Sequence, residues 1–221
     1  MAAVLGVDGS PDGWVAIRME ERRVTGAASY ATFSALLSAE ADAAVIAVDM
    51  PIGLPVVAAW PRGADAGARA FIGRMRSSVF VVPPVEALQA ATYPEAVQRC
   101  RDAGLPGLSQ QAYALRHKIF EVAAHISDRR VHEVHPEVSF AAMNERHLQY
   151  GKRTWNGHHE RHGILRRAGI EVPEDLGVLG RAGVDDVLDG IAAGWSASRI
   201  AAGTAMHLPA DASAGSPRIW Y

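Results

Sequence analysis

The sequence contains a single cysteine, Cys100, among its 221 residues. A disulfide framework and a cysteine-rich zinc site are therefore both excluded, and a reducing, cytoplasmic compartment is expected. No uncharged apolar run reaches the roughly 18 residues that a transmembrane helix requires, so we expect no membrane span. The start of the chain, MAAVLGVDGS, lacks the basic region and cleavage site of a signal peptide.

Several signatures of nucleotide-binding and hydrolytic enzymes are also missing. The chain has no Walker A motif, no GxGxxG, no HExxH and no Gly-x-Ser-x-Gly. A net charge of −2 argues against a strongly basic protein that coats DNA. What the chain does have is 49% hydrophobic and 21% charged residues, a composition typical of a globular protein.

The hydrophobic pattern predicts an α/β fold in a single domain spanning residues 1–221. Short apolar segments at residues 3–8, 14–19 and 22–30, separated by turn residues, predict three antiparallel strands. The continuous apolar run at residues 43–49 predicts a strand buried on both faces, and a further strand is predicted over residues 129–137, ending at Pro136.

Apolar residues at helical spacing predict the helices. They are expected over residues 31–40, 65–75, 109–128, 155–169 and 183–203. The segment from residue 54 to about residue 130 is then a mostly helical insertion. Three antiparallel strands, a helix and then parallel strands form the order of the ribonuclease H-like fold, which we therefore expect.

Carboxylates follow two of the predicted strands. Asp8 ends the first strand and Asp49 ends the strand after the first helix, so parallel pairing of these strands would place them side by side. Asp186 and Asp189 share one face of the last long helix. Carboxylates held this close repel one another, and a divalent cation is the usual remedy.

Structural roles are the alternative for each acid taken alone. Asp8 precedes Gly-Ser-Pro and could form an Asx-turn. Asp186 and its neighbour Asp185 lie in the first helical turn, where acids interact favourably with the helix dipole. The hypothesis of a shared site therefore depends on the convergence of all the acids.

Further polar residues are candidates for the same site. On the strand over 129–137, an alternation of period two places Glu133, His135 and Glu137 on one face, where the first two could bind a metal or orient a ligand. Arg76 lies beside Ser77 and Ser78, a group that can hold phosphate oxygens. A solvated helix end is the competing interpretation for that group.

The main basic segment spans residues 150–162 and includes Lys152 and the aromatic residue Trp155. Basic groups near an aromatic ring suit a nucleic-acid backbone and a stacked base. An exposed amphipathic helix is an equally good interpretation.

A set of short motifs, in order along nearly the whole chain, resembles the DUF429 family, whose members are described as predicted ribonuclease H-like nucleases. The motifs are GVDG (6–9), DMPIGLP (49–55), RSSVF (76–80), EVHPEVSF (133–140), KRT (152–154), DDVLD (185–189) and the ending IWY (219–221). The resemblance implies the ribonuclease H-like fold and a nuclease activity.

Within the wider superfamily, Holliday-junction resolvases carry acids on the first strand, on the fourth strand and as an Asp-x-x-Asp pair on the last helix. Asp8, Asp49 and the pair Asp186 and Asp189 resemble those positions. Glu133 fits no position of that pattern but belongs to the DUF429 motif. Members often have Cys where this chain has Ser10, which excludes a thiol role here, and the insertion could restrict the site to small substrates.

The leading hypothesis is thus a metal-dependent phosphodiesterase that uses Mg²⁺ or Mn²⁺. Asp8, Asp49 and Asp186 would hold two ions, which activate water and stabilise the leaving oxygen. Asp189 and Glu133 would support or replace these ligands.

Arg76 and Lys152 would neutralise the phosphate, with Ser77, Ser78 and His135 as further substrate contacts. The expected partner is a nucleic acid or a nucleotide-type phosphate. Two alternatives stay open: a Mg²⁺-nucleotide or phosphometabolite site related to actin-like ATPases, and a non-catalytic binding module.

Overall fold

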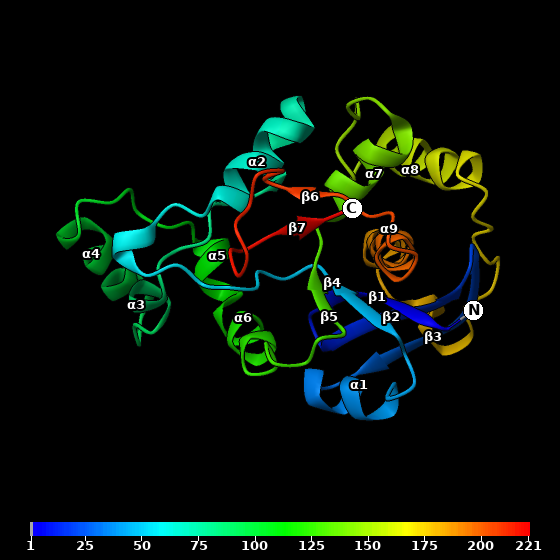
Figure 1. Ribbon diagram of the computed structural model, residues 1–221, viewed down its shortest axis with the longest axis horizontal. Helices are drawn as coiled ribbons and strands as arrows, with labels where there is room; N and C mark the ends of the chain where they lie inside the picture. Colours follow the sequence, from blue (N-terminus) through cyan, green and yellow to red (C-terminus); the bar gives the residue numbers. More distant parts are fainter. Residues whose placement is uncertain (1) are drawn as a thin grey trace.

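The central sheet of the computed structural model, which describes residues 2–221, contains β1 (Val4–Ser10), β2 (Gly13–Glu20), β3 (Arg23–Tyr30), β4 (Val45–Val48) and β5 (Val131–Glu133). The strand order is β3-β2-β1-β4-β5 (Figure 1). β1, β2 and β3 form an antiparallel meander, whereas β4 runs parallel to β1 and β5 runs parallel to β4. The predicted mixed α/β fold, with three antiparallel strands followed by parallel ones, is confirmed.

The side chains of β1 alternate between the two faces of the sheet. Val4 belongs to the hydrophobic core on one face, and Leu5 and Val7 belong to the core on the other. On β4, Ala47 lies in the first core and Val48 in the second. Both faces are covered, which explains why the sequence of these strands is almost continuously apolar.

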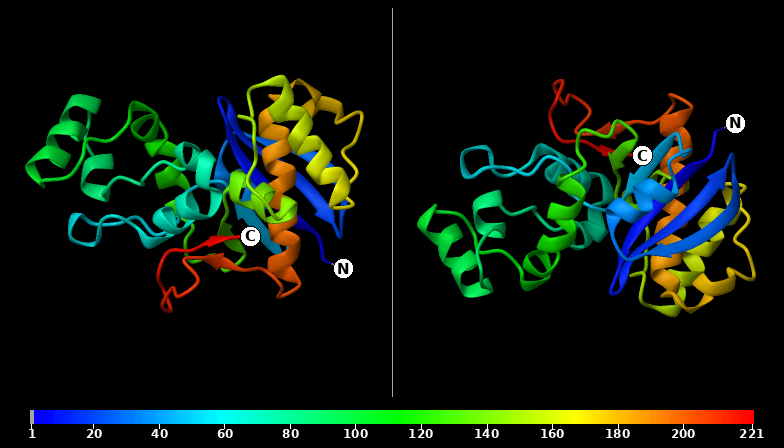
Figure 2. Two further views of the ribbon diagram at one scale, coloured as in Figure 1. Left: turned by 90° about the horizontal axis from the view of Figure 1, so that it is seen from above. Right: turned by 90° about the horizontal axis from the view of Figure 1, so that it is seen from below.

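Helix α9 (Val184–Ala201) crosses the first of these faces, and α1 (Phe33–Ala39) lies on the other (Figures 1 and 2). Glycines allow α9 to approach β1 at backbone distance. A Cβ atom on Gly6 would lie 1.9 Å from the carbonyl oxygen of Gly190, and one on Gly194 would lie 2.5 Å from the sulfur of Met19. This contact fixes the position of the acids at the start of α9 relative to the end of β1.

The insertion forms a lobe beside the sheet (Figure 2). Its elements are η1 (Val57–Ala59), α2 (Gly63–Ile72), η2 (Gly73–Ser78), α3 (Val85–Leu88), α4 (Tyr93–Asp102), α5 (Gln110–Ala114) and α6 (Arg116–Ala123). The predicted helix over residues 109–128 is wrong in its extent, because it divides at Leu115 and ends at Ala123. The Leu115 N–H is shared between the carbonyls of Gln111 and Tyr113, which tightens the turn at that point.

The chain then passes through α7 (Pro136–Asn144), α8 (Trp155–Arg167) and η3 (Gly177–Arg181) before α9. The predicted strand over residues 129–137 is too long. β5 ends at Glu133, His135 is the N-cap of α7, and Pro136 occupies the first helical turn, where proline is favoured. Because Glu137 is helical, the expected alternation of Glu133, His135 and Glu137 on one strand face does not occur.

The apolar end of the chain packs against the rest of the fold. A two-stranded ribbon forms from β6 (His207–Leu208) and β7 (Ile219–Trp220), and the backbone of Tyr221 pairs with that of Met206. The ring of Tyr221 packs against Phe71 of α2 with the centroids 4.9 Å apart. Among residues 2–221, no helix is both long enough and apolar enough to cross a membrane.

Candidate active site

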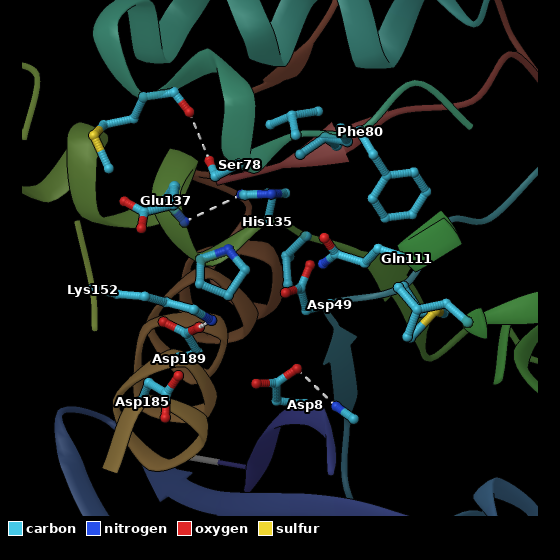
Figure 3. Close-up of a pocket in the computed structure, with 18 of the residues that line it drawn as sticks. Asp8, Asp49, Ser78, Phe80, Gln111, His135, Glu137, Lys152, Asp185 and Asp189 are labelled. Carbon is cyan, nitrogen blue, oxygen red and sulfur yellow. Dashed lines mark hydrogen bonds and ion pairs between the residues drawn. The ribbon is translucent and has the colours of Figure 1, made fainter. Parts of the chain in front are cut away.

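A cavity of about 560 Å³ lies where β1 and β4 end, between α9 and the insertion (Figure 3). Its wall brings together segments that are far apart in the sequence. The charged and polar side chains of the wall are Asp8, Asp49, Asp65, Ser77, Ser78, Gln111, Glu133, His135, Glu137, Lys152, Arg153, Thr154, Asp185, Asp186 and Asp189. The acids that the sequence analysis placed in one site therefore do line one cavity.

Asp8 and Asp49 are neighbours because their strands are paired. Val7 is in register with Val48, so the two aspartates follow on adjacent parallel strands, whose backbones lie about 4.8 Å apart. Asp8 is only 8% exposed, and its carboxylate accepts the N–H of Gly9 at 2.7 Å. An Asx-turn would use an N–H two residues on, so the turn interpretation does not account for this carboxylate.

The carboxyl groups of Asp8, Asp49 and Asp189 in the cavity have raised pKa values, and burial is the largest cause. Burial raises the pKa of Asp8 well above its usual range, and the negative charges of Asp49, Asp189 and Asp186 raise it further. Burial also raises the pKa of Asp49. Negative charge is therefore concentrated here in a poorly solvated place, and it favours the binding of a proton or another cation.

Lys152 supplies a positive charge to this cluster. Its ammonium donates to one carboxylate oxygen of Asp189, and the pKa of Lys152 is raised, against the effect of burial, by the charges of Asp189, Asp49 and Asp8. Asp189 itself is 2% exposed, and burial raises its pKa to about 6 in spite of Lys152. The second oxygen of Asp189 is buried without a hydrogen-bond partner in the structure.

Asp186 lies at the rim of the same cavity, one turn before Asp189 on α9. Burial and the charge of Asp185 raise the pKa of Asp186. The predicted shared face of Asp186 and Asp189 is thus present, with Asp185 beside it.

The acids do not form a ready-made set of metal ligands. Among the described residues, no three His, Cys, Asp or Glu side chains are arranged so that they could hold a metal ion. Asp8, Asp49 and Asp186 were expected to do so. Of the neighbouring acids, Asp189 is already paired with the ammonium of Lys152.

Glu133 has a different environment from the other acids. Its carboxylate accepts from Arg62 at 2.5 Å and from the N–H of Ile52 at 2.7 Å, and Arg62 also binds Asp65 at 2.9 Å. All three charged side chains are almost fully buried. Burial raises the pKa of Glu133 to about 7, although Arg62 opposes this effect. These pairs attach the insertion to the sheet, so the Glu133 carboxylate is already engaged by protein groups.

His135 caps α7 at the edge of the cavity. Its Nδ1 accepts the N–H of Glu137 at 3.2 Å. A neutral imidazole that accepts at Nδ1 carries its proton on Nε2, which leaves that nitrogen as a donor. His135 also lies near Asp49: burial raises the pKa of Asp49, and a positive charge on a protonated His135 opposes that rise.

The predicted phosphate-binding group at residues 76–78 lies at the end of η2. Ser77 and Ser78 line the cavity, and the Ser78 hydroxyl donates to the carbonyl of Met75 at 2.8 Å. Arg76 is not part of the described cavity wall. Arg153, next to Lys152, does line the cavity.

Residues of the wall to which the sequence pattern gave no role include Asp65, Phe80 and Gln111. Phe80 ends the motif RSSVF, in which the local pattern indicates no function for this ring. Nothing in the local pattern distinguishes Gln111 from other residues at the start of a helix. Trp155, which it did select, follows Thr154 of the wall, is 79% exposed and stacks on His159 with the ring centroids 6.0 Å apart.

The chain belongs to the DUF429 family. Residues 6–214 match this family, which is described as "Protein of unknown function (DUF429)". No curated protein matches the chain. No solved structure matches it either.

Proposed function

Starting from membership of the DUF429 family, we propose that this protein is a divalent-cation-dependent phosphodiesterase with a ribonuclease H-like fold. One observation carries the proposal. Asp8 lies on β1, Asp49 directly follows β4 and Asp189 lies on α9. The three gather in one cavity with more negative charge than Lys152 neutralises. Such a concentration of carboxylates suits a cation that brings an anionic phosphate to the site.

The topology supports the fold assignment. A sheet in the order 3-2-1-4-5, with an antiparallel meander and two parallel strands, is the arrangement expected of the ribonuclease H-like fold. The long last helix packs on β1 through Gly6 and Gly190, which brings Asp189 to the end of that strand.

The residues fit a magnesium-type ion. Mg²⁺ keeps several waters and commonly binds through one or two carboxylates together with substrate phosphate, so it does not need three protein ligands. Asp8 and Asp49 would hold it, and the unpartnered oxygen of Asp189 would join when Lys152 releases that side chain. The ion supplies polarisation of the phosphoryl oxygen and an activated water.

The positive and hydroxyl groups of the wall bind the phosphate in this proposal. Lys152 exchanges its pairing with Asp189 for the phosphate oxygens, and Arg153 adds a second positive charge at the rim. Ser77 contributes a hydroxyl donor. The Nε2–H of His135 donates to an oxygen of the phosphate or of the leaving group.

The test uses bis(p-nitrophenyl) phosphate with Mg²⁺, with Mn²⁺ or with EDTA. We expect hydrolysis with either metal and none in EDTA. Asp8→Asn should lower the rate by about a hundredfold or more, the scale expected when a charge-stabilising group leaves a reacting centre. The matched control is Asp211→Asn, which removes an exposed acid outside the cavity wall.

Thermal unfolding separates catalysis from binding alone. If Mn²⁺ raises the Tm of the wild type but not of Asp8→Asn, the cavity binds the ion. If in addition no phosphodiester is hydrolysed, the protein is a binding module. If Mn²⁺ changes neither Tm nor activity, the proposal is wrong.

A further inference from the structure

The cavity has a second side that the acids do not explain. Figure 3 shows Phe80 and Gln111 across the cavity from Lys152, with Asp49 between the two sides. Phe80 follows η2, and Gln111 lies in the first turn of α5, so both belong to the insertion. Leu115, the C-cap of the same helix, is an apolar residue that also lines the cavity.

Phe80 also borders a second cavity of about 290 Å³, which is lined mainly by apolar residues such as Trp60 and Leu108. One face of this region is therefore charged and the other is aromatic and apolar. With a cation and Lys152 on the charged side, a ligand that is anionic at one end and flat and apolar at the other would match both sides.

Gln111 adds hydrogen bonding to the aromatic side. Gln111 is exposed and lines the cavity, and its side-chain amide offers both a hydrogen-bond donor and an acceptor. The same pair of groups recognises the edge of a nucleobase. An aromatic ring such as Phe80 stacks on any base, because every base has a flat π-face.

We propose that Phe80 and Gln111 form a nucleobase subsite, so that the cavity takes a nucleobase-containing phosphate. The base lies against the Phe80 ring with its edge at the Gln111 amide, and the phosphate points to Lys152 and the acids. This inference rests on the proposed function only for the binding of the ligand's phosphate; the binding of its base does not depend on that function. The ligand is a free nucleotide or the unpaired end of a strand, which share this chemistry.

Calorimetric titration tests the subsite without turnover, because mononucleotides are not phosphodiesters. AMP, GMP, CMP and UMP are each compared with ribose 5-phosphate in the presence of Mg²⁺. We expect the best mononucleotide to bind about tenfold or more tightly than ribose 5-phosphate, the scale of one base stacked on an aromatic side chain.

Two variants locate the effect. Phe80→Leu should weaken mononucleotide binding about tenfold and leave ribose 5-phosphate unchanged. Gln111→Leu should reduce the differences among the four bases. The matched control, Phe120→Leu, makes the same chemical change in α6 outside both cavity walls and should change neither affinity.

The two possible sources are separated with a short single-stranded oligonucleotide. A strand end is indicated if the oligonucleotide binds more tightly than the mononucleotide and with a steeper salt dependence. Equal affinities indicate a free nucleotide, and both results support the subsite.

The subsite is refuted if ribose 5-phosphate binds as tightly as every mononucleotide, or if Phe80→Leu weakens both ligands alike. Failure of the subsite is distinguishable from failure of the proposed function. Metal-dependent hydrolysis without a base preference would refute only the nucleobase subsite. Base-dependent binding without hydrolysis would refute only the proposed phosphodiesterase activity.

Discussion

Ionised Asp189 should destabilise the fold, so Asp189→Asn should make the metal-free protein more stable at neutral pH. The side chain is 2% exposed, and its pKa is raised from 3.8 to about 6, chiefly by burial. The folded state binds the proton of Asp189 more tightly than the unfolded state does, so protonation of Asp189 stabilises the fold. This stabilisation is complete below the pKa that Asp189 has in the unfolded state. It is lost as the pH rises through about 6.

The size of the effect follows from the two pKa values. A difference of about two pKa units corresponds to about 3 kcal/mol at pH 7.5, at 1.36 kcal/mol per unit. Asparagine keeps an oxygen that can accept from Lys152, so part of the pairing is retained. For a chain of this length, about 3 kcal/mol corresponds to a rise in Tm of roughly 6–12 °C.

The assay is urea unfolding of the wild type and of Asp189→Asn in EDTA, at intervals between pH 4.5 and 8. We expect the variant's advantage to grow from pH 4.5 to about pH 6.5 and then to level off. A variant that is less stable at pH 7.5, or whose difference from the wild type does not vary with pH, would contradict the electrostatic reasoning.

Three further predictions concern other parts of the structure. Arg62→Met leaves the buried carboxylates of Glu133 and Asp65 without their cation and should cost about 3–5 kcal/mol in urea unfolding; an effect below 1 kcal/mol would contradict the role given to this cluster. Gly6→Ala places a Cβ atom against α9 and should lower the Tm and weaken Mn²⁺ binding together, measured by thermal unfolding with and without the ion; loss of neither would show that the close packing is not required. Trp155→Ala should leave the Tm and mononucleotide binding unchanged but weaken binding of a single-stranded oligonucleotide by about 1–3 kcal/mol in calorimetry, since this ring is 79% exposed; an unchanged oligonucleotide affinity would exclude it as a stacking surface.

Local patterns in the sequence were sufficient to predict the positions of Asp8 and Asp49. Each follows a short apolar run, and such runs form buried strands whose ends meet at one edge of a sheet. The start of α9 was predictable for a similar reason, because a long regular helix places Asp186 and Asp189 on one face.

Contacts between segments that are distant in the sequence could not be predicted from such local patterns. Nothing near Lys152 indicates that its partner is Asp189, and nothing near Glu133 indicates Arg62. Both pairs depend on the path of the insertion and of the segment before α8. Gln111 was missed for the same reason, since it reaches the cavity wall only through the folding of that insertion.

Helix and strand ends were also poorly predicted where one signal had two meanings. Pro136 was interpreted as the end of a strand, but proline equally favours the first turn of a helix, and it begins α7. Gly190 and Gly194 are small residues four apart, and this spacing allows the close packing of α9 on β1.

The most direct test of the cation site is a crystal of the full chain soaked in Mn²⁺, examined by anomalous scattering at the manganese edge. We expect a peak within about 2.0–2.3 Å of carboxylate oxygens of both Asp8 and Asp49, and its loss in Asp8→Asn crystals. A soaked crystal with no peak between these two side chains, and with Lys152 still bound to Asp189, would contradict this expectation.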